Sequence, residues 1–190
     1  GAEGDLKKMI EKKGEVGMMS FPVWYVALEA PNYPKAAFPE GIPVWFHVDG
    51  FSGDIHEMNT INHYVGMYPL EDGAKIERAL GPFLMLGISL LMILFICIRK
   101  KWSWIFMLPS ALFPLGFFAF YSGWMYWFGH NMQEWGAFKI KAFMPTALGV
   151  GHVAHFTTKS FPSIGFWVLV IIAVLSVLAL LARRNELKKQ

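Results

Sequence analysis

The chain has 190 residues, of which 55% are hydrophobic and 16% charged, with 17 Lys and Arg against 14 Asp and Glu. Ordinary soluble domains carry about 25% charged residues. The composition therefore excludes a purely soluble protein and a disordered chain, and the single Cys excludes a disulfide scaffold.

Three long stretches lack Asp, Glu, Lys and Arg altogether: residues 79–98, 102–133 and 160–182. Because a helix needs about 20 mainly apolar residues to cross a bilayer, we predict three transmembrane helices. Pro109 and Pro114 are expected to kink the second helix. The expected organisation is a polar arm (1–17), an exported β-rich domain (18–80), the first span (81–98), a cytoplasmic turn (99–101), the second span (102–128), an outer loop (129–162), the third span (163–182) and a cytoplasmic tail (183–190).

Basic residues flank the apolar stretches unevenly. The turn 99–101 and the tail 183–190 together carry seven Lys and Arg, whereas the loop 129–162 carries three. Short loops rich in Lys and Arg stay in the cytoplasm. We therefore predict that the N-terminal part and the 129–162 loop lie outside the cytoplasmic membrane and that the C-terminus lies inside.

Two further features bear on this topology. Residues 143–156 are mostly apolar but too few to cross a bilayer, so we expect an interfacial or re-entrant segment there. A domain on the outer side must be exported, and the chain does not begin with Met. A cleaved signal peptide, a trimmed N-terminus and a missing signal-anchor helix all fit this observation.

Residues 18–80 are expected to form a small β-rich unit. Aromatic and β-branched residues dominate 21–28 and 42–48, and Pro, Gly and Asn bound both runs, which is typical of strands. The proline-dense residues 30–41 predict an extended loop between them, and 71–80 predicts a helix leading into the first span. A domain of this size has only marginal stability when it folds alone. We therefore expect it to pack on the 129–162 loop or on a partner subunit.

All six histidines fall in the part predicted to lie outside, and none lies within a span. The densest group combines imidazoles with thioethers: His56, Met58, His63 and Met67. In a strand His56 and Met58 share a face, and in a helix His63 and Met67 share one. The outer loop supplies the secondary candidates His130, Met132, His152 and His155.

Imidazole together with thioether favours copper, because thioether is soft and suits Cu(I) while imidazole binds both oxidation states. Thiolate zinc and thiolate copper centres are excluded within this chain, since its one Cys lies in a predicted span. We predict a copper site at His56, Met58, His63 and Met67, and we assign no catalytic residue. The alternative is that the histidines are structural and that the pairs arise by chance in a chain with 11 Met.

The segments 29–34, 38–41 and 62–70 carry a resemblance. The last of them runs Asn-His-Tyr-Val-Gly-Met-Tyr-Pro-Leu. Together they resemble a group of exported bacterial membrane proteins that are associated with copper enzymes such as nitrous oxide reductase. The resemblance implies the inner membrane of a bacterium, an outer domain on the periplasmic or extracellular side, and a link to copper. It implies no ligand set.

Two functions fit these patterns. The first is a membrane-anchored copper-binding or copper-delivery protein that serves a copper-dependent respiratory or monooxygenase-type enzyme. The second is a non-catalytic accessory subunit of a multi-subunit membrane complex, since small residues such as Gly116 and Gly123 permit close helix contact. A mononuclear metal enzyme is disfavoured, because no acid–base or nucleophile motif is present.

The expected partners follow from the same patterns. They are the lipid bilayer and either other membrane subunits or a periplasmic copper enzyme. The Lys and Arg beside the spans account for the basic charge, so it does not indicate nucleic-acid binding.

Overall fold

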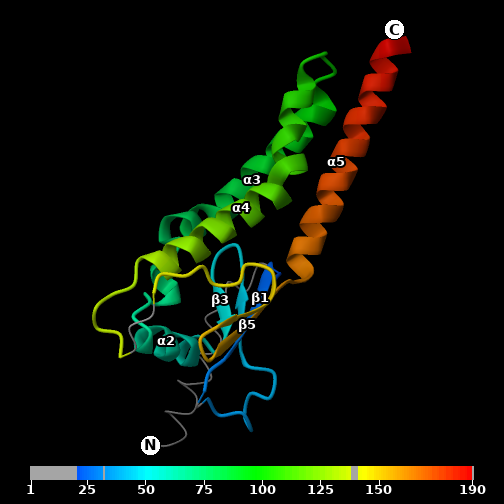
Figure 1. Ribbon diagram of the computed structural model, residues 1–190. Helices are drawn as coiled ribbons and strands as arrows, with labels where there is room; N and C mark the ends of the chain where they lie inside the picture. The colour runs from blue at the N-terminus through cyan, green and yellow to red at the C-terminus, as the bar shows by residue number, and fades with distance from the viewer. Residues whose placement is uncertain (1–20, 32, 138–140, 190) are drawn as a thin grey trace, which may run out of the picture.

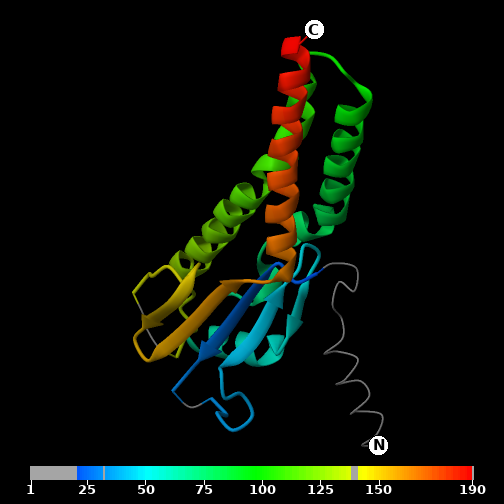
Figure 2. The same cartoon turned by 90° about the vertical axis from the view of Figure 1, so that its right-hand side faces the viewer.

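The computed structural model describes residues 21–31, 33–137 and 141–189. Within these residues, a sheet and a short helix occupy one end of the molecule, and three long helices extend away from it (Figure 1, Figure 2). The predicted polar arm, 1–17, lies outside the described residues.

The sheet has five antiparallel strands in the order β3-β2-β1-β5-β4. Both runs of aromatic and β-branched residues predicted to be strands do form strands, as β1 and β2. The bounds are β1 Trp24–Glu29, β2 Ile42–Phe46, β3 Phe51–Gly53, β4 Gly149–Val153 and β5 Phe156–Pro162.

Strand β1 lies at the centre of the sheet, because it pairs with β2 on one side and with β5 on the other. Trp24 is opposite Phe46 in β2 and opposite Pro162 in β5. Strands β4 and β5 both come from the 129–162 segment, so residues that follow the second long helix complete the sheet begun by the N-terminal unit. The prediction that the small β-rich unit packs on this loop is confirmed.

The segment 143–156, predicted to be interfacial or re-entrant, takes a different form. Residues 149–153 are strand β4, and they pair with β5 so that His152 lies opposite Thr157. The chain then turns back at 154–155 directly into β5. Pairing within the sheet satisfies the backbone polar groups that a re-entrant segment must bury. The structure thus corrects the re-entrant form of this expectation for 149–153, and β4 forms an edge of the sheet, while the interfacial form stays a prediction.

In the described part of the chain, three helices are long and apolar enough to cross a bilayer. Helix α3 begins at Lys75 rather than at residue 81, because most of the predicted helix 71–80 continues into the first span without a break. Pro109 lies in the first turn of α4, where backbone N–H groups have no acceptor within the helix, so the missing N–H of proline costs no hydrogen bond. Pro114 lies within the helix. The bounds are α3 Lys75–Cys97, η2 Ser103–Met107, α4 Leu108–His130 and α5 Ile164–Lys189.

The helix ends far from the sheet are joined by Arg183. Figure 1 places the α3–α4 connection and the C-terminus at the same end of the molecule, opposite the sheet. There the Arg183 guanidinium donates to the carbonyls of Phe95 and Ile98, each at 3.1 Å, and to Ser103 Oγ at 3.3 Å. One cation on α5 thus satisfies carbonyls at the C-terminal end of α3.

Trp24 fixes the sheet to the long helices. Its side chain is 1% exposed, and its ring packs on Tyr121 of α4 and Phe166 of α5, with ring centroids 5.1 and 5.2 Å apart. Its Nε1 donates to Ser160 Oγ in β5 at 2.8 Å. The sheet and the helices therefore share one core and do not form separate domains.

Candidate metal site and the groove between α3 and α4

The segment that holds the predicted ligands is a helix, and this decides where their side chains point. Helix α2 covers Ile55–Tyr64. Two residues apart on a helix are separated by about 200° around its axis. Accordingly His56 is exposed while Met58 is 5% exposed and belongs to the core. The structure does not bring His56 and Met58 together.

His63 and Met67 are also separated. Helix α2 ends at Tyr64, and the chain turns at Gly66, whose φ is +79°. The exposed imidazole of His63 stacks against the indole of Trp135 with ring centroids 6.2 Å apart. Met67 turns inward and packs against the core. The four predicted ligands thus divide into two exposed imidazoles and two inward thioethers.

The two exposed histidines share one face of α2. His56 and His63 line a shallow hollow together with Asn59, Thr60 and Tyr64. Seven residues of helix separate them, which is about 10 Å along the axis and about twice the spacing of an i, i+4 pair. As placed, these imidazoles belong to the surface of α2 and not to the cavity lined by the methionines.

The secondary candidates are dispersed. The His130 ring stacks on Tyr126 with centroids 3.8 Å apart, and its Nδ1 lies 2.9 Å from that residue's carbonyl oxygen. His152 on β4 is hydrogen-bonded to Thr157 Oγ1 at 2.9 Å, His155 is exposed in the β4–β5 turn, and Met132 is partly buried. No group of three or more His, Cys, Asp or Glu in the described ranges is placed to hold a metal ion.

Met58 and Met67 nevertheless line one and the same cavity, and Met125 of α4 joins them. The cavity has a volume of about 90 Å³. Met58 and Met125 are 5% and 8% exposed. Sequence reasoning missed Met125, because it lies inside the predicted span 102–128 and has no histidine two or four residues away. Its position near the outer end of that span was the one available signal.

The rest of this methionine cavity is aliphatic or aromatic, apart from Asn62, Thr146 and Thr158. Asn62 is 6% exposed. No charged side chain from the described part of the chain lines the cavity. Neutral, soft thioethers in an apolar space suit a soft monovalent cation, whereas Cu(II) favours nitrogen and oxygen ligands in a tetragonal arrangement. The residues present therefore fit Cu(I) better than Cu(II).

A second and larger hollow, which we call the α3–α4 groove, separates two of the long helices. Its volume is about 1020 Å³. Two of its walls come from α3 between Glu77 and Leu91 and from α4 between Pro109 and Phe128, and residues of β2, β3, the turn between them and the segment before α3 close the end next to the sheet. Most of the lining is apolar, including Phe83, Leu84, Leu91, Phe113, Phe117 and Phe120. The charged residues in its lining, Glu77 and Arg78, lie at the end next to the sheet.

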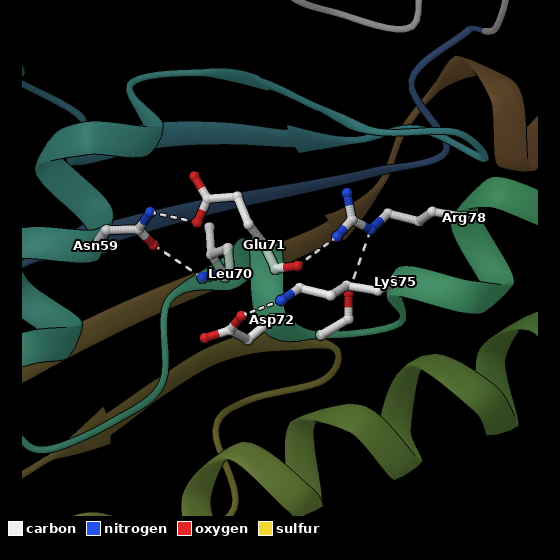
Figure 3. A network of polar contacts seen from close by, with 7 residues as sticks. Asn59, Leu70, Glu71, Asp72, Lys75 and Arg78 are labelled. Atoms are coloured by element: carbon white, nitrogen blue, oxygen red, sulfur yellow. Dashed lines mark hydrogen bonds and ion pairs between the residues drawn. The ribbon is translucent and has the colours of Figure 1, made fainter.

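Figure 3 shows how Arg78 is held at this end of the groove. Its Nη2 donates to the Glu71 carbonyl at 2.6 Å and its Nε to the Gly73 carbonyl at 3.2 Å. The Glu71 carboxylate turns the other way and accepts a hydrogen bond from Asn59 Nδ2 at 2.6 Å. Arg78 is therefore bound through main-chain oxygens, and no carboxylate among the described residues forms an ion pair with it.

Comparison with known proteins identifies no relative of this chain. No protein-family model, curated protein or solved structure matches the chain. The residues themselves provide soft thioethers in the methionine cavity and an apolar groove with one charged end.

Proposed function

We propose that the protein is anchored by α3, α4 and α5 in the cytoplasmic membrane of a bacterium and holds Cu(I) on the outer side for a copper-dependent respiratory or monooxygenase-type enzyme. The observation that carries the proposal is that Met58, Met67 and Met125 line one cavity. The membrane setting is supported by the three apolar helices. The outer position is supported by the basic residues at the helix ends opposite the sheet.

The composition of the cavity favours one oxidation state. Burying a charge without partners is expensive, and the cost rises with the charge of the ion. Cu(I) carries a single charge and prefers thioether sulfur, so three methionines compensate its desolvation better than that of Cu(II) or Zn²⁺. Asn62 also lines the cavity and is buried, and we propose its side-chain amide as a further ligand. The proposed role is to hold and transfer Cu(I), without catalysis.

The test is a Cu(I) competition titration of the full chain in mild detergent against a chromogenic chelator. Wild type is expected to bind one Cu(I) per chain, and Met58→Leu, Met67→Leu and Met125→Leu to lose most of that affinity. Leucine conserves volume, so the core stays filled. Met144→Leu is the matched control, because Met144 is 45% exposed and does not line the cavity. Absence of copper binding, or equal affinity in all four variants, would refute the proposal.

The second candidate function, an accessory subunit of a larger membrane complex, is favoured by the edge strand β4. Beside and on this strand, Leu148 and Val150 are 57% and 54% exposed. A free strand edge with apolar neighbours is a surface on which another chain can add a strand. Stable copurification with other subunits in mild detergent would support this function, and a monodisperse monomer that carries Cu(I) would count against it.

A further inference from the structure

We infer that the α3–α4 groove binds one phospholipid with a zwitterionic headgroup, whose phosphate lies at Arg78, whose ammonium lies at Glu77 and one of whose acyl chains runs between the helices. The inference rests on the membrane setting proposed above. It does not depend on copper, although the groove and the methionine cavity share the wall residues Phe46, Leu70, Met125 and Phe128.

The size and shape of the groove match an acyl chain. On α3 its lining runs from Glu77 to Leu91, which is about 20 Å of helix. One leaflet of the hydrocarbon core is about 15 Å thick, so the groove is long enough for one chain and the start of a headgroup. Its volume of about 1020 Å³ is at the upper end of the range for ligand pockets. Added methyl groups at Gly87 and Gly116 would meet nothing within 4 Å, so the groove is open at these two positions.

An acyl chain with a polar head matches the distribution of charge in the groove, because the lining is apolar along the helices and charged only beside the sheet.

The charges at the end of the groove identify the headgroup. Arg78 donates through Nε and Nη2 to two backbone carbonyls, and its remaining terminal nitrogen, Nη1, forms no hydrogen bond or ion pair within the described residues. The Phe51 ring, 4.5 Å from the guanidinium carbon, holds the side chain in place. Arginine recognises phosphate through such fixed donors. Glu77 lines the same end, so a headgroup with both a phosphate and an ammonium complements both charges.

The test is lipid analysis of the full chain reconstituted from vesicles of phosphatidylethanolamine and phosphatidylglycerol, followed by native mass spectrometry. Wild type is expected to retain one phosphatidylethanolamine. Arg78→Gln is expected to weaken retention by roughly 10-fold, the effect of losing one hydrogen bond to a charged group. Glu77→Gln is expected to abolish the preference for phosphatidylethanolamine over phosphatidylglycerol.

Two glycines of α4 make it possible to distinguish the effect of filling the groove from the effect of adding a side chain elsewhere on the helix. Gly116 lines the groove and Gly123 does not, yet both lie on α4 and an added Cβ meets nothing within 4 Å at either. Gly116→Leu is therefore expected to expel the lipid, while Gly123→Leu retains it. Thermal unfolding of Gly116→Leu in detergent, followed by tryptophan fluorescence, serves as the folding control.

Three results would overturn the inference: no retained lipid in wild type, equal retention in Gly116→Leu and Gly123→Leu, or a protein chain in the groove instead of a lipid. These outcomes are independent of the copper titration. If wild type binds Cu(I) but retains no lipid, this inference alone is refuted. If wild type retains the lipid but does not bind Cu(I), only the proposed function is refuted.

Discussion

Trp24 Nε1 donates a hydrogen bond to Ser160 Oγ at 2.8 Å, although 136 residues of sequence separate the two. The hydroxyl of Ser160 donates in turn to the carbonyl of Ala147 at 2.9 Å. Tyr121 Oη lies 3.1 Å from Ser160 Oγ. Ser160 is fully buried. One small polar side chain therefore joins β1, β5, α4 and the segment that leads into β4.

Replacing this serine tests whether the sheet and the helices unfold as one unit. Ser160→Ala leaves the buried indole N–H of Trp24 without its acceptor, so the free energy of unfolding is expected to fall by about 2 kcal/mol. Thermal unfolding in detergent, followed by tryptophan fluorescence, measures the change. Ser89→Ala is the control, because that exposed hydroxyl bonds only its own helix at Met85. An effect of Ser160→Ala no larger than that of Ser89→Ala would contradict the shared core.

Arg183 is expected to hold the far ends of α3 and α5 together. Arg183→Lys keeps the charge but loses the planar fork that reaches Phe95 and Ile98. Limited trypsin digestion should then cleave faster at the basic turn 99–101. Arg184→Lys, at the neighbouring exposed position, is the control and should digest like wild type. Equal cleavage rates in the two variants would show that Arg183 does not fasten this end.

Local patterns in the sequence predicted the elements better than they predicted the partners of those elements. The strands 24–29 and 42–46 and the three long helices follow from runs of β-branched, aromatic and apolar residues. The pairing of β1 with β5 joins Trp24 to Pro162, and no short-range pattern encodes such a contact. For the same reason the apolar character of residues 143–156 does not reveal that 149–153 form β4 and pair with β5.

The stability of the sheet is expected to depend on alkaline pH through Lys159. Its ammonium lies 2.9 Å from Glu29 and 3.3 Å from Glu40, and hydrogen bonds to Glu29 and then to Glu40 raise the pKa of Lys159. Because the pKa of Lys159 is higher in the folded chain, its ammonium contributes to the free energy of unfolding in full below about pH 10.4, the pKa of lysine in an unfolded chain. This contribution is lost as the pH rises through the pKa in the folded chain. Burial also raises the pKa of Tyr25, which acts in the same direction because the unfolded tyrosine ionises first.

Unfolding temperatures measured from about pH 9 to about pH 11 check this prediction. The midpoint of wild type should fall across the range, and it should fall less in Lys159→Met and in Tyr25→Phe. A pH-independent midpoint in wild type, or identical slopes in all three proteins, would contradict it.

The candidate site could be predicted in part. The sequence pointed to Met58 and Met67 as copper ligands, and the structure places both on one cavity. The pairing of His56 with Met58 requires a strand, in which residues two apart share a face, and the pairing of His63 with Met67 requires a helix that includes both residues. The first requirement fails in α2, where His56 and Met58 lie on opposite sides. Only the tertiary fold places Met125 of α4 on the same cavity as Met58 of α2.

The division between imidazoles and thioethers gives a prediction about pH. Thioethers do not bind protons, so Cu(I) affinity at the methionine cavity should change little between about pH 5 and about pH 8. A site that used His56 or His63 would weaken in the acid part of this range as imidazole protonates. Chelator competition across the range, with wild type and His63→Ala side by side, tells these apart. A drop in affinity at low pH that disappears in His63→Ala would contradict the thioether site.

The most direct test of the central claim is X-ray absorption at the copper edge of the Cu(I)-loaded full chain. The account predicts a first shell made of sulfur, supplied by Met58, Met67 and Met125, that loses sulfur in Met125→Leu and is unchanged in Met144→Leu. A shell of nitrogen with the multiple scattering of imidazole, or a spectrum that Met125→Leu leaves unaltered, would contradict it.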